Sequence, residues 1–346
     1  MKFLKLVFII LIVFLKTGNL LSDNNLFSVN NIFLEKKDNY STKKLANQAI
    51  KKAFNQLTNR IILNEDLSKV VNLKFSNVRE LVAYYNISKN SEGESNKINF
   101  SVTFDKEKIH DLFYKKGILY SDIADKEFFI LPILLKENEV FIFSNNYFYK
   151  NWNSFVSDEL LEFILPLENI EIIYDINKSK NNLLDIELSS LFKEYPNKNT
   201  GIVLIEESTD KEENIFLKAK IQNKIISKSL RLKKDNLDKT KYNQKKISLV
   251  KNEIEDLVKS QNLIDISTPS FLNVKLNLDE NNNLAQLKTR INNIDLIENV
   301  FVQEFNKNHM NLKIKYLGKL EKIINQMKKE NISLKLIKNQ WFIEII

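Results

Sequence analysis

The chain has 346 residues, of which 43% are hydrophobic, and it contains only five glycines and four prolines, a composition that excludes a disordered or loop-rich protein. It has no cysteine, which excludes disulfides and thiol chemistry. The 52 basic and 44 acidic residues give a net charge of +8 that is well mixed along the chain. No basic and aromatic residues interleave in the pattern of single-strand binders, so we expect no nucleic-acid partner.

The first 22 residues resemble an export signal. Lys2 and Lys5 precede an unbroken apolar run over residues 6–15, which polar residues then end. This run is shorter than the roughly 20 apolar residues that span a bilayer. We therefore predict a signal peptide over 1–22, or an N-terminal anchor that gives membrane association if it is not cleaved, because Leu20 and Ser22 make a poor cleavage site. An exported protein without cysteine favours the periplasm or cell envelope of a bacterium.

Residues 23–118 are predicted to form a first domain. A strand over 26–34 precedes a helix with one continuous apolar face, for which Ser41 or Thr42 is a suitable N-cap. Strand-like runs at 81–87 and 98–104 predict a hairpin, and a short helix over 106–116 should end at Gly117. The apolar face of the long helix consists of Leu45, Ala46, Ala49, Ile50, Ala53, Phe54, Leu57 and Ile61.

Residues 119–235 are predicted to form a central α/β domain. Its first strand, over 128–135, contains Pro132, which favours an edge or a bulge. Across Asn223, runs at 215–221 and 225–232 predict a hairpin. The other predicted strands are 140–143, 161–167, 170–174 and 201–205, and the predicted helices are 147–156 and 183–192.

Residues 236–268 are predicted to form a basic linker and a connector helix that starts near Ser248. Residues 269–346 are predicted to form a C-terminal domain. In this domain, apolar residues from Met310 to Tyr316 alternate with Asn311, Lys313 and Lys315, typical of a sheet with one wet face. The element order β-α-β-β-α-β plus one strand predicts a ferredoxin-like unit. The fold class is therefore α+β, built from two or three small two-layer units.

The residues offer little catalytic chemistry. His110 and His309, the only histidines, lie in different domains without a partner at ligand spacing, so we expect no metal site and no cofactor. No nucleophile elbow, P-loop or dinucleotide motif is present. Glu206 and Glu207 follow a buried strand, but neighbouring strand residues point to opposite sides and cannot act as an acid/base pair.

An aromatic cluster, formed by Tyr147, Phe148, Tyr149, Trp152 and Phe155, allows two interpretations. The favoured one is a core stripe, because Phe148, Trp152 and Phe155 share a helical face. The alternative is an aromatic-walled groove for a peptide or glycan, lined by Tyr147, Tyr149 and Trp152.

A locally basic segment runs from Arg231 to Lys246 and is diluted by two aspartates. Its basic residues are Arg231, Lys233, Lys234, Lys239, Lys241, Lys245 and Lys246. The favoured interpretation is a solvated linker. The alternative is contact with an anionic lipid, a glycan or an acidic partner.

Several short motifs resemble the proteobacterial envelope proteins of domain-of-unknown-function family 2066. Two features differ: Glu168-Asn169 stands where the family has glycine after Pro166, and Tyr-Phe-Tyr at 147–149 replaces an aromatic-rich run. The resemblance implies an envelope compartment and implies no activity. The motifs are Leu-Phe-Ser-Val at 26–29, the helix at 46–60, Val-Thr-Phe-Asp at 102–105, Leu131-Pro132, Asn151-Trp152, Leu-Pro-Leu at 165–167 and Tyr-Leu-Gly at 316–318.

The sequence thus predicts an exported, non-catalytic envelope protein that binds or scaffolds an envelope protein or a glycan. One alternative is an envelope-polymer hydrolase that uses carboxylates or serine. Another is a lipid- or lipopolysaccharide-contacting protein that uses the basic segment.

Overall fold

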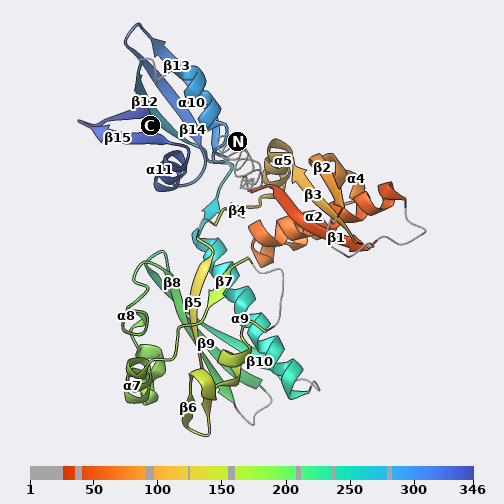
Figure 1. The fold of residues 1–346 in the computed structure, drawn as a ribbon, viewed down its shortest axis with the longest axis vertical. Coiled ribbons are helices and arrows are strands. Elements are labelled where there is room, and N and C mark those ends of the chain that lie inside the picture. Colours follow the sequence, from red (N-terminus) through yellow and green to blue (C-terminus); the bar gives the residue numbers. More distant parts are fainter. Residues whose placement is uncertain are drawn as a thin grey trace, which may run out of the picture. The chain divides into compact units, whose positions relative to one another are not determined.

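The computed structural model describes residues 26–35, 41–89, 97–123, 125–154, 160–207, 212–234, 238–278 and 283–346. They form an α+β protein with several small sheets, as the sequence predicts (Figure 1). The predicted signal peptide or anchor over 1–22 lies outside the described residues. The chain divides into two compact units. The described residues of Met1–Thr58, Lys69–Ile118 and Asp265–Ile346 form the first, and those of Asn59–Ser68 and Leu119–Ile264 form the second, here called the central unit.

The N-terminal part of the first unit is a three-stranded antiparallel sheet with strand order β1-β3-β2. All eight apolar positions predicted for the long helix α2 are buried. Asp105 caps α5 by accepting backbone N–H groups, and Gly117 ends that helix at φ +58°. The elements are β1 (Ser28–Glu35), α2 (Thr42–Ile61), α3 (Ser68–Val71), α4 (Phe75–Glu80), β2 (Val82–Lys89), β3 (Lys97–Phe104) and α5 (Lys106–Lys116).

The C-terminal part of the first unit is a five-stranded sheet with strand order β13-β14-β12-β16-β15. Buried and half-buried residues alternate strictly along β14, as the sequence predicts. The helices α10 and α11 bury Leu287, Ile291, Ile323 and Met327, so they cover the apolar face of this sheet. The elements are β12 (Ser270–Asn277), α10 (Leu284–Ile291), β13 (Ile297–Phe305), β14 (His309–Tyr316), α11 (Leu320–Lys329), β15 (Ile332–Ile337) and β16 (Gln340–Ile345).

This sheet departs from the ferredoxin-like plan at its last strands. In that plan the fourth strand lies beside the first. Here the additional strand β16 lies beside β12 and parallel to it, and β15 is displaced to the edge. A tight turn with positive φ at Lys338 and Asn339 joins β15 to β16 and returns the chain into the sheet. The predicted element order is present, but the strand order differs from that of a ferredoxin-like sheet.

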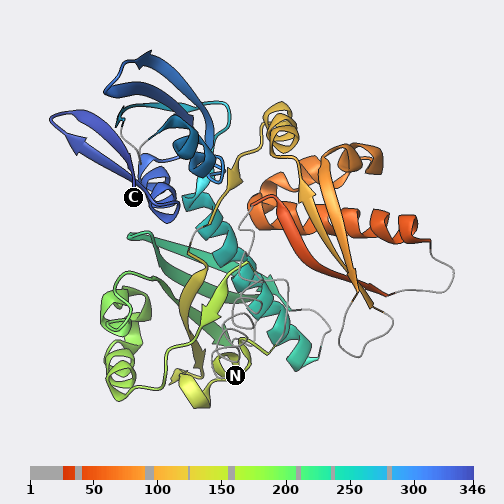
Figure 2. The same cartoon turned by 45° about the horizontal axis from the view of Figure 1, so that its top comes forward.

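The central unit is built on a mixed sheet with strand order β10-β9-β8-β5-β6, in which β7 also pairs with β5. Figures 1 and 2 show α9 along one face of this sheet and α7 and α8 on the other side. The elements are η1 (Asn64–Asp66), β4 (Tyr120–Ser121), β5 (Glu127–Lys136), β6 (Glu139–Phe141), η2 (Phe143–Asn145), α6 (Tyr147–Asn151), β7 (Glu162–Ile164), α7 (Ile170–Lys178), η3 (Lys180–Asp185), α8 (Leu188–Leu191), β8 (Asn199–Glu207), β9 (Glu212–Ile221), β10 (Lys224–Lys233), α9 (Lys239–Gln261) and β11 (Leu263–Ile264).

Two hydrophobic cores lie on the two faces of the central sheet. In β8, Val203 and Ile205 belong to the core that includes residues of α6 and α9. Ile202 and Leu204, on the other face, belong to the core that includes residues of α7 and α8. Because both faces are covered, the strand is a continuous apolar run and not an alternating one.

Pro132, for which the sequence predicts an edge or a bulge, lies where one side of β5 has no neighbouring strand. On one side β5 pairs with β8 over residues 128–136. On the other side β7 pairs with residues 127–129 and β6 with residues 134–136, so Pro132 lies between them. Its carbonyl accepts a hydrogen bond from Asn146 Nδ2 at 2.9 Å. The missing N–H of proline therefore removes no hydrogen bond between strands.

The structure corrects two predictions within the central domain. Residues 170–174, predicted as a strand, form the first part of α7. Asn169 caps this helix by accepting the backbone N–H of Glu171 at 2.7 Å, and Ile172 and Ile176 are buried on one face. The predicted helix over 183–192 is instead divided between η3 and α8. Short apolar runs fit both helical and strand periodicity, which explains the first error.

Helix α9 also differs from its prediction. It begins at Lys239 and not near Ser248, with Asp238 as its N-cap. Ile247, Val250 and Ile254 belong to a core of the central unit, so α9 is part of that unit and not a connector. The lysines at its start obscured the apolar face in the sequence.

Candidate functional site

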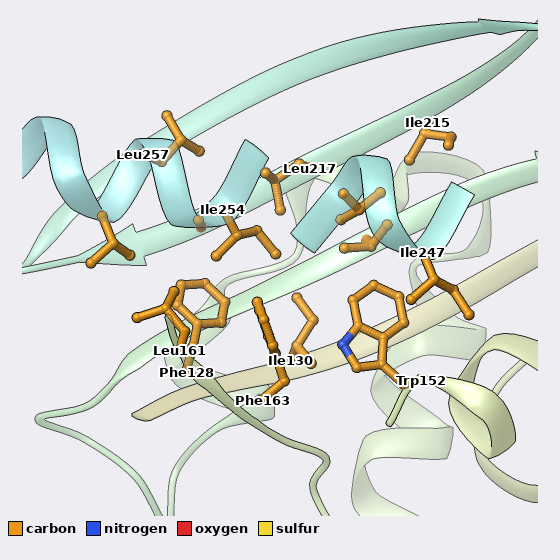
Figure 3. Close-up of a cluster of buried hydrophobic side chains, with 14 of the residues drawn as sticks. Phe128, Ile130, Trp152, Leu161, Phe163, Ile215, Leu217, Ile247, Ile254 and Leu257 are labelled. Atoms are coloured by element: carbon orange, nitrogen blue, oxygen red, sulfur yellow. The ribbon is translucent and has the colours of Figure 1, made fainter. Parts of the chain in front are cut away.

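Trp152, the centre of the predicted aromatic cluster, lies in the core beneath α9 (Figure 3). Its side chain is 0% exposed and contacts the Phe163 ring edge-to-face, with 6.4 Å between centroids. Its indole nitrogen is buried without a hydrogen-bond partner among the described residues. The ring therefore cannot form the wall of an open groove. Phe155, predicted on the same helical face, lies outside the described residues.

The two tyrosines of the cluster do not form a site with Trp152. Tyr147 packs against the same core as Trp152, whereas Tyr149 packs against the core on the other face of the sheet. Tyr149 Oη donates a hydrogen bond to the Pro166 carbonyl at 2.7 Å. Burial, together with the nearby charge of Glu168, raises the pKa of the Tyr149 hydroxyl. The hydroxyl is thus used in a structural contact.

The predicted basic candidates lie at the end of an edge strand. Arg231 and Lys233 are exposed residues of β10, and Lys234 follows them and lies 3.5 Å from the carboxylate of Glu213. Exposed charges on an edge strand hinder pairing with another chain. We interpret Arg231 and Lys233 in this way, as protection of the sheet edge.

A buried ion pair lies in the segment predicted as a solvated linker. Lys246 of α9 and Glu213 of β9 form a salt bridge, and each residue is only 3% exposed. The Lys246 ammonium also lies 4.6 Å from the Tyr242 ring centroid and 5.5 Å from that of Phe148. Burial of a charge requires such partners. The pair therefore joins α9 to the sheet.

Glu207, at the end of β8, is also held by lysines. Lys239 donates a hydrogen bond to it at 2.9 Å, and Lys136 lies 3.8 Å away. The hydrogen bond from Lys239 lowers the pKa of the Glu207 carboxyl, so it stays ionised. Glu206 points to the opposite face of the strand. This arrangement is a surface ion cluster and gives no acid/base pair.

A different set of polar residues gathers on the second, solvent-facing side of the C-terminal sheet. In the register of β12 and β14, Asn273 lies opposite Lys313 and Lys275 lies opposite Asn311. Directly opposed side chains on one face have Cβ atoms about 5 Å apart. Amide and ammonium groups therefore alternate both along each strand and across the two strands, over four neighbouring positions. We call these four residues the amide–lysine patch.

A pocket of about 310 Å³ opens at this patch. Asn311 Nδ2 donates a hydrogen bond to Glu304 Oε2 at 2.7 Å, and Gln340 Nε2 donates to the Trp341 carbonyl at 3.0 Å. A register shift in β13 between Val302 and Glu304 allows two successive residues to line the pocket. The polar residues of its wall are Asn273, Gln303, Glu304, Asn311 and Gln340.

Exposed aromatic rings lie beside the patch on the same side of the sheet. Phe271 is 50% exposed and Phe301 is 44% exposed. The Lys313 ammonium lies 4.4 Å from the Phe271 ring centroid, and Phe301 is the β13 neighbour of Lys313. The surface thus offers four amide groups, flat apolar rings and cations to one ligand.

The described part of the chain contains no group of three or more histidine, aspartate or glutamate side chains that could hold a metal ion. Among the helices of the described ranges, none has both the length and the apolar character needed to cross a membrane.

Sequence analysis identified the wet face of β14 but not this site. The missing information was the pairing of β12 with β14, which brings two remote segments together. A usable signal was present, because both strands contain Asn-x-Lys, at 273–275 and at 311–313. In antiparallel strands, two such motifs place each amide opposite a lysine.

Comparison with known proteins gives no assignment. No family model matches the chain. No relative was found among the curated proteins. Among solved structures, the chain is similar to one described only as an uncharacterized protein, with 7% identity over 40% of this chain and 94% of that chain, and a TM-score of 0.17.

Proposed function

We propose that this protein is an exported, non-catalytic binding protein of the bacterial envelope, and that the amide–lysine patch with its pocket binds a glycan. The observation that carries this proposal is the pocket wall, in which four of the five polar residues have amide side chains. Membership of family 2066 belongs to the same proposal.

The chemistry of the pocket suits sugar hydroxyls. A hydroxyl both donates and accepts hydrogen bonds, and a side-chain amide offers both an acceptor oxygen and donor N–H groups. The exposed rings of Phe271 and Phe301 can pack against the C–H face of a sugar ring. Concave sites with a few polar groups and apolar walls are typical of ligand binding.

The carboxylates of the pocket favour binding over hydrolysis. Most glycoside hydrolases use two carboxyl groups that flank the scissile bond. The described wall contains one, Glu304, and this carboxylate accepts a hydrogen bond from Asn311. The arrangement therefore supports recognition of a glycan without cleavage.

Calorimetric titration of the protein with soluble envelope oligosaccharides tests the proposal. We expect binding to be lost in the double variant Asn273→Ala/Asn311→Ala. The control is Asn277→Ala, which removes an amide at the end of the same strand, outside the pocket wall. Binding that survives the double variant, or that falls equally in the control, would contradict this site.

Export is tested separately. Residues 1–25 fused to a reporter that is active only outside the cytoplasm should give signal, and a silent reporter would refute the envelope part of the proposal.

A further inference from the structure

We infer that the glycan bound at the amide–lysine patch is anionic, with carboxylate groups that contact Lys275 and Lys313. The inference rests on the proposed function and names the chemical class of its ligand. It starts from the distribution of charge over the solvent-facing side of the C-terminal sheet.

Two lysines of the C-terminal sheet are neutralised by the protein itself. Lys315 pairs with Glu298 at 2.7 Å, and Lys335 pairs with Glu344 at 2.7 Å. Neither Lys275 nor Lys313 forms an ion pair with a carboxylate of the described residues. Among the lysines within the five strands of this sheet, Lys275 and Lys313 are therefore the two whose charge is left available to a ligand.

The environment of these two lysines favours an external anion. Lys313 is half-buried and held over the Phe271 ring, which orders its ammonium group. Lys275 is half-buried on the neighbouring strand. The one carboxylate of the pocket wall, Glu304, is bound by Asn311 and does not pair with either lysine. An ordered ammonium group that forms no ion pair with a carboxylate of the described residues can form one with a ligand carboxylate.

The spacing of the patch fits a charged sugar chain. Lys275 and Lys313 occupy diagonal positions, for which Cβ atoms are roughly 7 Å apart, and the two amides occupy the other diagonal. A carboxylated oligosaccharide presents hydroxyls between its charges, and these hydroxyls match Asn273 and Asn311. A single-stranded nucleic acid would also use cations and aromatic rings, but it requires a positively charged groove that follows its backbone. Two cations beside four amides favour the glycan.

The test compares two probes that share one sugar backbone, of which one is charged and the other neutral. Oligogalacturonate carries a carboxylate on each sugar, and its methyl ester has the same backbone without charge. We expect the protein to bind the acid at least about tenfold more tightly than the ester, since charge-assisted hydrogen bonds from lysine to a carboxylate are stronger than those to a neutral ester. This preference should weaken as salt concentration rises.

The double variant Lys275→Gln/Lys313→Gln should bind acid and ester within about threefold of each other, with the ester affinity unchanged. The matched control, Lys328→Gln/Lys329→Gln, removes the same charge from the last turn of α11 and should keep the full preference. Circular dichroism and tryptophan emission verify that both variants are folded, as expected for exposed or half-exposed positions.

Each other outcome has a defined meaning. Equal binding of acid and ester by the wild-type protein, with loss of both in Asn273→Ala/Asn311→Ala, would overturn the anionic ligand and leave the proposed function intact. Absence of binding to any oligosaccharide would overturn both. Tighter binding of poly(U), lost in Lys275→Gln/Lys313→Gln, would replace the glycan with single-stranded nucleic acid.

Discussion

The central sheet and the C-terminal sheet contain the same kinds of residue but differ in how many of their faces are covered. Along β8 seven successive residues are buried, because a hydrophobic core lies on each face of the central sheet. Along β14 burial alternates, because the second face of the C-terminal sheet meets solvent. The sheet with one covered face retains a row of polar side chains that can meet a ligand. The candidate site therefore lies on the C-terminal sheet, whose second face meets solvent. The aromatic residues of the central unit are instead packed into the cores of that unit.

Charged substitutions on the two strands should separate these sheets most strongly. In the C-terminal sheet, Leu312→Asp should unfold the sheet, since an unpaired buried charge costs several kcal/mol. Lys313→Asp removes the contact with the Phe271 ring on the solvent-facing side and should lower the free energy of unfolding by only about 1 kcal/mol. In the central sheet, Val203→Asp and Leu204→Asp should both unfold the unit, because their side chains enter different cores.

Urea titrations followed by tryptophan emission measure these effects in each region. Trp152 reports the central unit and Trp341, in β16, reports the C-terminal sheet, so Trp341→Phe and Trp152→Phe isolate the two signals. Equal destabilisation by Leu312→Asp and Lys313→Asp would contradict the register of β14.

The two tryptophans allow the same comparison at single side chains, since Trp152 lies in the central unit and Trp341 in the C-terminal sheet. Trp152→Ala deletes a fully buried ring and should lower the free energy of unfolding by about 3–5 kcal/mol. In the folded protein, iodide should quench Trp341, which is half-buried, more than Trp152. Strong quenching of Trp152 in the Trp341→Phe variant would contradict its place in the core.

The ion pairs of the two regions should also differ. Glu213→Gln leaves Lys246 buried without its carboxylate and should destabilise the central unit by about 3–5 kcal/mol. The control is Glu344→Gln, which breaks an exposed pair with Lys335 in the C-terminal sheet and should change stability by less than about 1 kcal/mol. Urea midpoints measure both, and a small effect of Glu213→Gln would show that the buried pair is not needed for packing of α9.

The N-terminal sheet region offers a pH-dependent test. His110 is buried against the Phe27 ring, and burial, together with the nearby charge of Lys106, lowers its pKa from 6.5 to about 4. Between these values the unfolded chain binds more protons than the folded one, so stability present above pH 6.5 is lost as pH falls toward 4. The loss can reach about 3 kcal/mol.

The variant His110→Gln isolates this contribution. The difference between wild-type and variant unfolding free energies, measured by urea titration from pH 7 to pH 4, should change with pH through this interval. A difference that is constant with pH would contradict the depressed pKa of His110.

The sequence predicted long periodic elements well and short ones poorly. All eight inner positions of α2 and the alternation of β14 follow directly from residue spacing, because packing acts on every turn or every second residue. The error at residues 170–174 arose because this short apolar run fits both the helical and the strand periodicity. Only the N-cap at Asn169 favours the helix. The start of α9 was missed because a lysine in a basic segment is expected to be solvated. Lys246 is buried only because it pairs with Glu213, which lies on a different strand.

The site was the least predictable part. Its four central residues come from strands 36 or more residues apart (Lys275 to Asn311), and only their antiparallel register makes them neighbours. The ferredoxin-like strand order failed for a related reason, because the position of β16 depends on which neighbour it pairs with, and local sequence does not specify this.

Lysine footprinting tests the central claim most directly. The protein is acetylated with and without saturating oligogalacturonate, and modification at each lysine is measured by mass spectrometry. We predict protection of Lys275 and Lys313, which are half-buried in the C-terminal sheet, and unchanged modification of Lys233, which is exposed on the edge strand β10. Protection confined to Lys233 and Lys234, with Lys275 and Lys313 still modified, would place the ligand on the central unit and contradict the account.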